Sequence, residues 1–263
     1  MKLTHIFDSR RTWAWPYVLF LVLFVLLPLL LIFVYAFTDP QGHFTLQNFV
    51  TFAHKSEAVN TFIYSIAVAL ITTIICLLLG YPAAYIMATA ELKTPAVMAM
   101  LFILPMWINF LLRTIATVEL FNMFGIPLGE GALLYGMCYD FLPFMIYPIY
   151  NTLQKMDRSL IEAAHDLGAN GVQVFTKVIL PLSVPGIYSG IIMVFMPTVS
   201  TFAISEFLTN NKIKLFGTII QENINNSMWN YGAALSLVML VIIGITTLLQ
   251  GSDKQEDAAG GVI

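Results

Sequence analysis

Long uninterrupted apolar runs restrict what this chain can fold into more than any other feature. Six runs, at residues 15–37, 60–89, 95–118, 131–152, 183–205 and 231–250, are long enough to cross a bilayer, since a spanning helix needs about 20 apolar residues. The chain is 59% hydrophobic and only 10% charged. We therefore expect an all-α integral membrane protein with about six transmembrane helices.

The placement of lysine and arginine predicts the orientation. With the N-terminus in the cytoplasm, most basic residues outside the spans fall on the cytoplasmic side. We expect both termini there, with a cytoplasmic segment 1–14, a transmembrane domain 15–250 and a disordered acidic tail 251–263. The cytoplasmic residues would be Lys2, Arg10, Arg11, Lys93, Lys155, Arg158, Lys177 and Lys254, and the outer ones Lys55, Lys212 and Lys214.

The largest predicted cytoplasmic loop, 153–182, lies between the fourth and fifth spans and is polar. Ser159 and Glu162 have the spacing of a capping box, which predicts that a helix starts at Ser159. Ala163 and Ala164 favour the helix and carry little side-chain bulk. Such a surface lets another protein approach closely.

Gly168 predicts a left-handed turn that ends this first helix. A second amphipathic helix follows, and we expect it to end at Pro181. The segment is then either a docking surface for a partner or an interfacial loop that only connects two spans.

The stretch EAAHDLGANGVQVFTKVILP at 162–181 resembles the coupling motif of ABC importer permeases. The resemblance implies coupling helices that dock into a groove on a cytoplasmic ATPase subunit. No phosphate-binding G-x-x-x-x-G-K-[ST] pattern occurs, so we expect ATP hydrolysis in partner subunits and no enzyme activity or cofactor in this chain. The matching positions are Glu162, Ala163, Ala164, Gly168, Leu180 and Pro181, with Val178 where isoleucine is more usual.

Further segments resemble the permease subunits of spermidine/putrescine importers: LGYPAAYIMA at 79–88, LPMWINFLLR at 104–113 and LPFMIYPIYNTLQKMDRSLIEAAHDLGA at 142–169. This resemblance implies polyamine import across the bacterial cytoplasmic membrane. It also implies a second permease subunit, two ATPase subunits and an extracytoplasmic substrate-binding protein as partners. The acidic tail departs from the basic ending expected of that family.

Ionisable residues inside spans are candidates for the substrate path. Asp140, Phe144, Tyr147 and Asn151 follow the i, i+4, i+7, i+11 pattern and share one helix face. A carboxylate and aromatic rings suit the ammonium groups and methylene stem of a polyamine. A second interpretation stays open, in which Asp140 simply pairs with Arg113 of the third span.

The W-x-N-x-x-x-R pattern of the third span, formed by Trp107, Asn109 and Arg113, is the more subfamily-specific part of the resemblance. These three residues and Glu206 complete the path candidates.

The alternatives are an importer permease for another small solute and, less favoured, a secondary transporter. A secondary transporter usually carries an internal repeat, and we find no convincing one. We find no catalytic motif of an intramembrane enzyme, no metal site among the scattered histidines and no nucleic-acid-binding motif.

Overall fold

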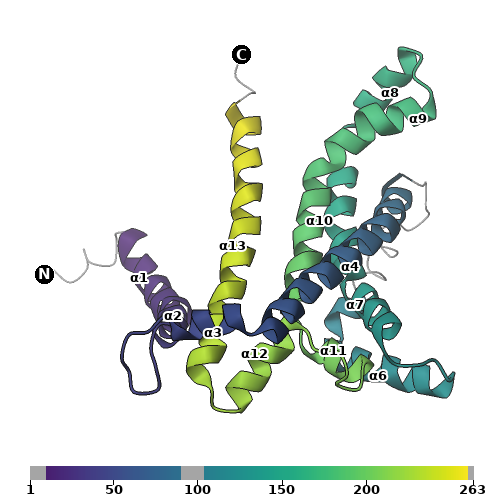
Figure 1. Cartoon of the computed structure of the whole chain (residues 1–263). Coiled ribbons are helices and arrows are strands. Elements are labelled where there is room, and N and C mark those ends of the chain that lie inside the picture. The colour runs from purple at the N-terminus through teal and green to yellow at the C-terminus, as the bar shows by residue number, and fades with distance from the viewer. Residues whose placement is uncertain (1–9, 90–103, 260–263) are drawn as a thin grey trace, which may run out of the picture. The chain divides into compact units, whose positions relative to one another are not determined.

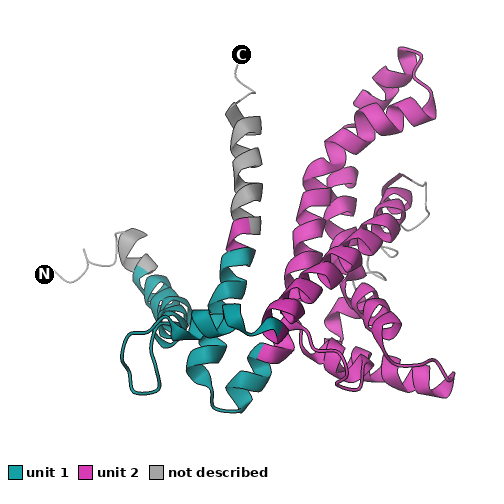
Figure 2. Cartoon of the chain, viewed as in Figure 1, with its two compact units in different colours: residues 1–56, 220–242 teal, residues 57–219, 243–263 magenta. Residues whose placement is uncertain are grey.

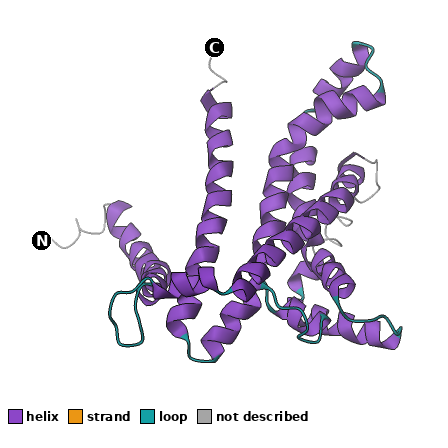
Figure 3. Ribbon diagram, viewed as in Figure 1, coloured by secondary structure: helices purple, strands orange, loops and turns teal. Residues whose placement is uncertain are grey.

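A computed structural model describes the backbone at residues 10–89 and 104–259, and the side chains at 15–89 and 104–245. In these ranges every regular element is a helix, and one isolated bridge joins Thr38 to Phe44 (Figures 1 and 3). This agrees with the all-α expectation.

The chain divides into two compact units (Figure 2). Unit 1 comprises residues 1–56 and 220–242, and unit 2 comprises residues 57–219 and 243–263. In unit 1, α1 (Arg10–Leu21), the π-helical turn η1 (Val22–Leu26) and α2 (Leu27–Ala36) form one continuous apolar helix. The short helix α3 (Gln47–His54) follows.

Two asparagines tie the loop after α2 to other elements of unit 1. The amide of Asn48, on α3, donates to the carbonyls of Ala36 and Thr38 at 3.0 and 3.1 Å. The amide of Asn230, in the first turn of α13 (Trp229–Ala259), donates to the carbonyl of Thr38 at 2.8 Å. The buried Ala36 packs with Ala233 in the same unit.

Four helices are long and apolar enough to cross a membrane: Trp15–Ala36, α4 (Ser56–Thr89), α7 (Glu130–Gln154) and the continuous helix Gly171–Ser200. They correspond to the first, second, fourth and fifth predicted spans. The fifth begins twelve residues before the predicted 183 and ends before 205, because the helix starts inside the loop 153–182. The sixth predicted span lies in α13, and the residues of α13 with described side chains, Trp229–Ile245, form an apolar helix.

The third predicted span, 95–118, is not one helix in its described part; residues 95–103 lie outside the described residues. A 3-10 turn, η2 (Leu104–Trp107), precedes a break, and α6 (Phe110–Met123) starts after it. Asn109 causes the break, because its side-chain oxygen accepts from the amide of Leu111 at 2.8 Å and so caps a new helix start. The third predicted span is therefore interrupted at Asn109 within its described part.

The segment 206–230, between the fifth and sixth predicted spans, is partly helical. It contains the end of α11 (Ala203–Leu208) and the whole of α12 (Phe216–Asn225). The tail departs from prediction, because α13 continues to Ala259 and residues 260–263 lie outside the described residues. The stretch 253–259, DKQEDAA, is rich in good helix formers, which explains the continuation.

In unit 2, α7 packs closely against α10 (Leu180–Ser200) because glycines remove the side chain at the contact. A Cβ atom on Gly190 would lie 2.7 Å from the sulfur of Met145, and one on Gly186 would lie 2.6 Å from the hydroxyl of Thr152. Neither distance is tolerable for a real side chain. The two helices therefore form a tight hairpin, and the segment between them lies at one end of it (Figure 1).

Candidate functional site

The first helix of the segment between α7 and α10 is α8 (Arg158–Asp166). Its N-cap is Asp157, whose carboxylate accepts from the amide of Ser159 at 2.9 Å. This hydrogen bond is also the main cause that lowers the pKa of Asp157. The capping box predicted for Ser159 and Glu162 is therefore wrong, because the N-cap is Asp157, two residues earlier, and its carboxylate already accepts from the amide of Ser159.

The left-handed turn predicted at Gly168 is confirmed, since its φ is +80°. The amide of Gly168 donates to the carbonyl of His165 at 2.9 Å, and the amide of Ala169 donates to the carbonyl of Ala164 at 3.0 Å. These bonds satisfy carbonyls at the end of α8. A side chain other than glycine or asparagine would be strained at this backbone conformation.

The next helix, α9 (Gly171–Val174), starts with a capping box that the sequence analysis missed. Asn170 accepts from the amide of Gln173 at 2.9 Å, and the side chain of Gln173 accepts from the amide of Asn170 at 2.9 Å. The N-x-x-Q spacing was the available signal. The backbone of the turn is thus satisfied by its own residues.

Pro181 does not end the second helix, contrary to the prediction. A π-helical turn, η3 (Phe175–Ile179), joins α9 to α10, and the amide of Leu180 donates to the carbonyl of Phe175 five residues earlier. A proline ring clashes with the carbonyl four residues before it in a straight helix, and the wider π turn accommodates it. Leu180 and Pro181 consequently lie inside the continuous helix Gly171–Ser200.

The α8–α9 segment exposes apolar side chains that the sequence analysis did not single out. Leu167 is 89% exposed, Val172 is 73% exposed and Leu160 is 46% exposed. Ala163 is also exposed, and it shares a helix face with Leu160 and Leu167. Exposed apolar groups gathered on a segment with a well-ordered backbone are typical of a binding surface.

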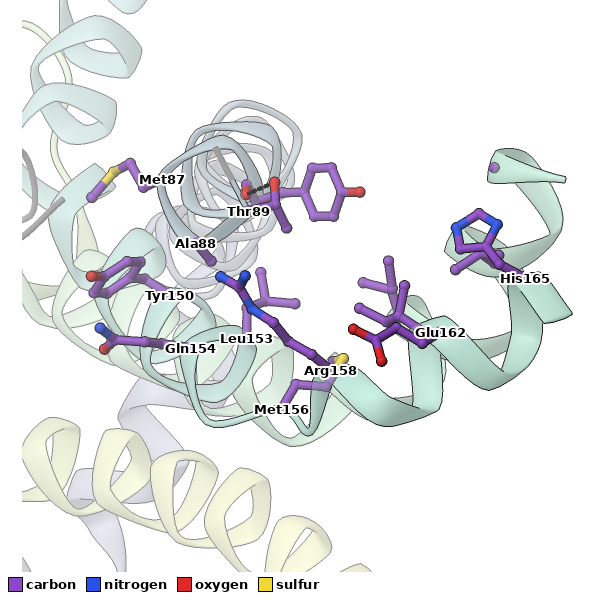
Figure 4. Close-up of a pocket in the computed structure, with 15 residues that line it drawn as sticks. Met87, Ala88, Thr89, Tyr150, Leu153, Gln154, Met156, Arg158, Glu162 and His165 are labelled. Carbon is purple, nitrogen blue, oxygen red and sulfur yellow. Dashed lines mark hydrogen bonds between the residues drawn. The ribbon is translucent and has the colours of Figure 1, made fainter. Parts of the chain in front are cut away.

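The opposite face of α8 borders a pocket of about 430 Å³ (Figure 4). Arg158, Ile161, Glu162 and His165 line it, at the i, i+3, i+4, i+7 spacing of one helix face. The last turns of α4 and α7 line the other side. Glu162 therefore lies on the pocket face, whereas Ala163 lies on the exposed apolar face.

A second polar site is buried between α6 and α7. The guanidinium Nη2 of Arg113 lies 3.2 Å from the carboxylate of Asp140, and the two side chains are 6% and 2% exposed. The hydroxyl of Thr114 donates to the other carboxylate oxygen at 3.3 Å. The guanidinium also lies over the ring of Tyr139, 5.7 Å from its centre. The two charges thus compensate each other away from water.

The pairing of Arg113 with Asp140 is incomplete in one respect. Nε and Nη1 of Arg113 are buried without a hydrogen-bond partner among the described residues. Among the described path candidates, these two residues are the ones joined by an ion pair. The contact is the geometry that the pairing interpretation requires.

The other path candidates have different surroundings. Tyr147 is 44% exposed and Asn151 is half-buried, although both share the face of Asp140 on α7. Trp107 is 87% exposed and Asn109 caps α6. Glu206, on α11, is half-buried. The face of α7 is therefore covered at Asp140 and open at Tyr147.

Comparison with known proteins gives a family model and several relatives. The model of the family described as "Binding-protein-dependent transport system inner membrane component" matches residues 7–252. The chain is 33% identical to the spermidine/putrescine transport system permease protein PotB of Escherichia coli (strain K12), over 87% of this chain and 92% of that protein. It is 28% identical to the PotB homolog of Mycoplasma genitalium, over 80% and 79% of the two chains.

Solved structures show the same fold at low sequence identity. A chain of a bacterial ABC transporter that imports the acidic polysaccharide alginate has a TM-score of 0.66 at 17% identity, over 92% of this chain and 96% of that one. A chain of the bacterial alginate ABC transporter in complex with alginate pentasaccharide-bound periplasmic protein has a TM-score of 0.67 at 16% identity, over 95% and 96%. For a chain of the inward-facing MetNI methionine ABC transporter the TM-score is 0.61 at 16% identity, over 75% and 94%.

Proposed function

This chain belongs to the family of binding-protein-dependent transport system inner membrane components, and from that premise we propose that it carries a polyamine across the bacterial cytoplasmic membrane. It is a multi-pass permease of the ABC importer type, homologous to the PotB polyamine permeases. Spermidine or putrescine is the proposed substrate, because relatives named for these two compounds share 33% identity over most of both chains.

The proposed topology has six spans and both termini in the cytoplasm. The excess of lysine and arginine on the cytoplasmic side of that arrangement supports it. The permease would work beside a second, related permease subunit, and each would bind one ATPase subunit. An extracytoplasmic binding protein would deliver the substrate, because the family description states that transport depends on a binding protein.

The α8–α9 segment is the proposed docking site for the ATPase. The observation that carries this proposal is the exposure of Leu160, Leu167 and Val172 on a segment whose backbone hydrogen bonds are already satisfied. Such a surface is preorganised, so a partner binds it without the cost of ordering it. The residues proposed to couple the permease to the ATPase are Glu162, Ala163, Ala164, Gly168, Leu180 and Pro181.

The α7–α10 hairpin provides a route by which docking moves the spans. Close contact at Gly186 and Gly190 leaves little room for the two helices to slide independently. The helix is continuous from Gly171 to Ser200, so a displacement of α9 is carried directly into a membrane-spanning segment.

The proposed substrate path uses the open part of the α7 face and not its covered part. Tyr147 and Asn151 offer an aromatic ring and an amide, and the exposed ring of Trp107 suits cation–π contact with an ammonium group. Asn109 and Glu206 stay candidates. Arg113 neutralises Asp140 and would repel a cation, so we assign this pair to holding α6 against α7.

Reconstitution tests the function. The permease pair, the ATPase subunit and the binding protein are placed in liposomes, and uptake of labelled spermidine and ATP hydrolysis are measured together. Hydrolysis stimulated by polyamine-loaded binding protein, with uptake that requires ATP, is the expected result. Stimulation by a different solute would assign another substrate, and uptake driven by an ion gradient without ATP would overturn the importer assignment.

A further inference from the structure

Two tyrosines on α4, Tyr81 and Tyr85, lie one helical turn apart and hold a ring from the segment that joins α9 to α10. This ring belongs to Phe175, the first residue of the π turn η3. It packs edge to face on both tyrosines, with ring centres 5.9 Å from Tyr81 and 5.6 Å from Tyr85 and interplanar angles of 84° and 83°. Rings in this arrangement attract each other and fix their relative orientation.

Tyr81 makes a second contact, on the other side of the π turn. Its hydroxyl oxygen lies 3.0 Å from that of Ser183, on α10. Ser183 donates its own proton to the carbonyl of Leu180 at 2.8 Å, so Tyr81 is the donor in the bond between the two hydroxyls. Tyr81 is therefore joined to Phe175 by its ring and to Ser183 by its hydroxyl, with the π turn between these two points.

The four residues Tyr81, Tyr85, Phe175 and Ser183, which we call the clasp, are largely covered. Tyr81 is 9% exposed and Ser183 is fully buried. Val174, the residue before Phe175, is buried in the same apolar core as Tyr81. A buried hydrogen bond and ring contacts in close-packed surroundings leave the two segments little freedom to move separately.

The place of the clasp in the chain points beyond packing. Phe175 directly follows α9, which belongs to the proposed docking surface, but Phe175 itself is turned inward and half-buried. The helix that it contacts, α4, is long and apolar enough to cross a membrane. A displacement of α9 therefore reaches a span other than α10 through one side chain.

We propose that the clasp couples ATPase docking to α4, so that α4 moves together with α10 when the ATPase changes conformation. Phe175 is then a positioning residue for transport, because it acts through Tyr81 and Tyr85 and not by touching the ATPase or the substrate. This inference rests on the docking role proposed above for α8–α9. It adds α4 to the spans that docking moves through the α7–α10 hairpin.

Phe175→Leu tests the proposal in the reconstituted transporter. Leucine keeps an apolar side chain at this position and removes the ring that the two tyrosines hold. The ATPase subunit should be recovered at normal yield, whereas the amount of spermidine imported per ATP hydrolysed should fall about tenfold, as expected for the loss of two edge-to-face contacts. Phe175→Tyr keeps the ring and should import as much per ATP as the unmodified transporter.

Phe62→Leu is the matched control on the same helix. The ring of Phe62 also packs edge to face, with its centre 4.9 Å from that of Phe216, but this contact joins α4 to α12 and not to the docking segment. The variant therefore loosens α4 away from the clasp, and import per ATP should not change. An equal loss in Phe62→Leu and Phe175→Leu would show that any loosening of α4 is enough, and would overturn the proposal.

A distance measurement tests the common movement directly. Spin labels replace Ile86 on α4 and Leu182 on α10, which are 59% and 42% exposed and lie outside the clasp. In the otherwise unmodified complex, the distance between the labels should be the same without nucleotide and with ATP and vanadate bound. In Phe175→Leu the two distances should differ, because α4 no longer follows α10.

The two assays separate failure of the clasp from failure of the proposed substrate. If the unmodified transporter imports no polyamine, the substrate proposal fails and the distance measurement still decides on the clasp. If import per ATP and the label distances are unchanged in Phe175→Leu, the clasp proposal is wrong. If Phe175→Leu does not assemble, Tyr81→Phe decides, because it removes only the bond to Ser183. Import per ATP should then fall about fivefold, as for one lost hydrogen bond, and an unchanged value would overturn the proposal.

Discussion

Two polar regions interrupt the apolar helices of unit 2, and they differ in where their partners lie. Arg113 and Asp140 are buried and contact each other, so the partner of each charge is in the same chain. The α8–α9 segment satisfies its own backbone but exposes Leu167 and Val172. Its side chains have no comparable cover within the described chain.

The contrast separates two kinds of consequence. A charge left unpaired in a buried site costs several kcal/mol, so the Arg113–Asp140 pair should act on stability. An exposed segment adds little to the free energy of unfolding when its side chains change. Substitutions in α8–α9 should therefore act on ATPase binding and transport more than on folding.

Breaking the buried pair should have the largest effect. Asp140→Asn leaves the Arg113 cation buried without its carboxylate, and we expect a loss of about 3–5 kcal/mol in the free energy of unfolding. The measurement is the thermal and denaturant unfolding of the purified complex. The double variant Arg113→Gln with Asp140→Asn should recover most of the loss, because no buried charge remains.

The same pair of variants distinguishes pairing from substrate contact. If Asp140→Asn keeps normal stability and yield but loses polyamine uptake, and the double variant does not recover it, then Asp140 contacts the substrate. The assignment of the pair to holding α6 against α7 would then be wrong.

Straining the turn at Gly168 should have the next largest effect. The added Cβ of Gly168→Leu meets no atom within 4 Å, so strain at φ +80° is its main cost, roughly 1–2 kcal/mol. We expect loss of the ATPase subunit in a pull-down and loss of uptake. Gly168→Asn should retain both, because asparagine tolerates the left-handed region.

Gly125 offers a matched control for Gly168. It also has a positive φ, +66°, and open space around it, but it lies in the turn after α6. Gly125→Leu should cost similar stability and leave ATPase recovery unchanged. Equal loss of the ATPase in both leucine variants would show that strain in any turn suffices and that the Gly168 turn has no special part in docking.

Removing one exposed side chain should affect binding alone. Leu167→Ala deletes an apolar group that is 89% exposed, so the unfolding temperature should not change. Binding to the purified ATPase subunit should weaken about tenfold if Leu167 is buried at the interface. Phe124→Ala is the control, because Phe124 is 65% exposed on a different turn. Unchanged affinity for Leu167→Ala would remove this residue from the docking surface.

The smallest effect concerns the cap of α8. Asp157→Ala should increase hydrogen exchange in the first turn of α8, whereas Ser159→Ala should not, because Asp157 and not Ser159 caps the helix. If hydrogen exchange became faster in Ser159→Ala but not in Asp157→Ala, Ser159 would be the cap, as the sequence predicted.

The cap should also depend on pH. The hydrogen bond from Ser159 lowers the pKa of Asp157 below its ordinary value of 3.8. A group whose folded pKa is lowered stabilises the fold above the ordinary value, and the contribution is lost as the pH falls through the folded pKa. Exchange in the first turn of α8, corrected for intrinsic rates, should therefore rise at pH 3 relative to pH 7. Asp157→Asn should cap the helix without this dependence.

Local patterns predicted several features because each depends on residues close in the chain. Apolar runs gave helices of spanning length at four of the six predicted positions among the described residues. Gly168 gave its left-handed turn, since a helix that stops needs a residue free of Cβ strain. The coupling pattern at 162–181 pointed to the family that the comparison then identified.

Other features escaped prediction because two local signals competed. Asp157 and Ser159 are both good N-caps, and the sequence does not show which one the helix uses. Asn109 inside an apolar run was considered only as a path residue, and the helix start that its side chain caps was not predicted. Proline often ends a helix, so Pro181 was predicted to do so. The sequence pattern contains no signal for the π turn that precedes it.

The sequence by itself determined the class of the molecule, its apolar helices and its coupling pattern, because burial in lipid and backbone geometry at glycine are local requirements. Only the tertiary structure shows that Arg113 lies within 3.2 Å of Asp140 from another helix, which is the geometry that the pairing interpretation requires. It also divided α8 into an exposed apolar face and a charged pocket face. Both depend on how helices distant in sequence pack, and helix periodicity shows which residues share a face but not what lies opposite that face.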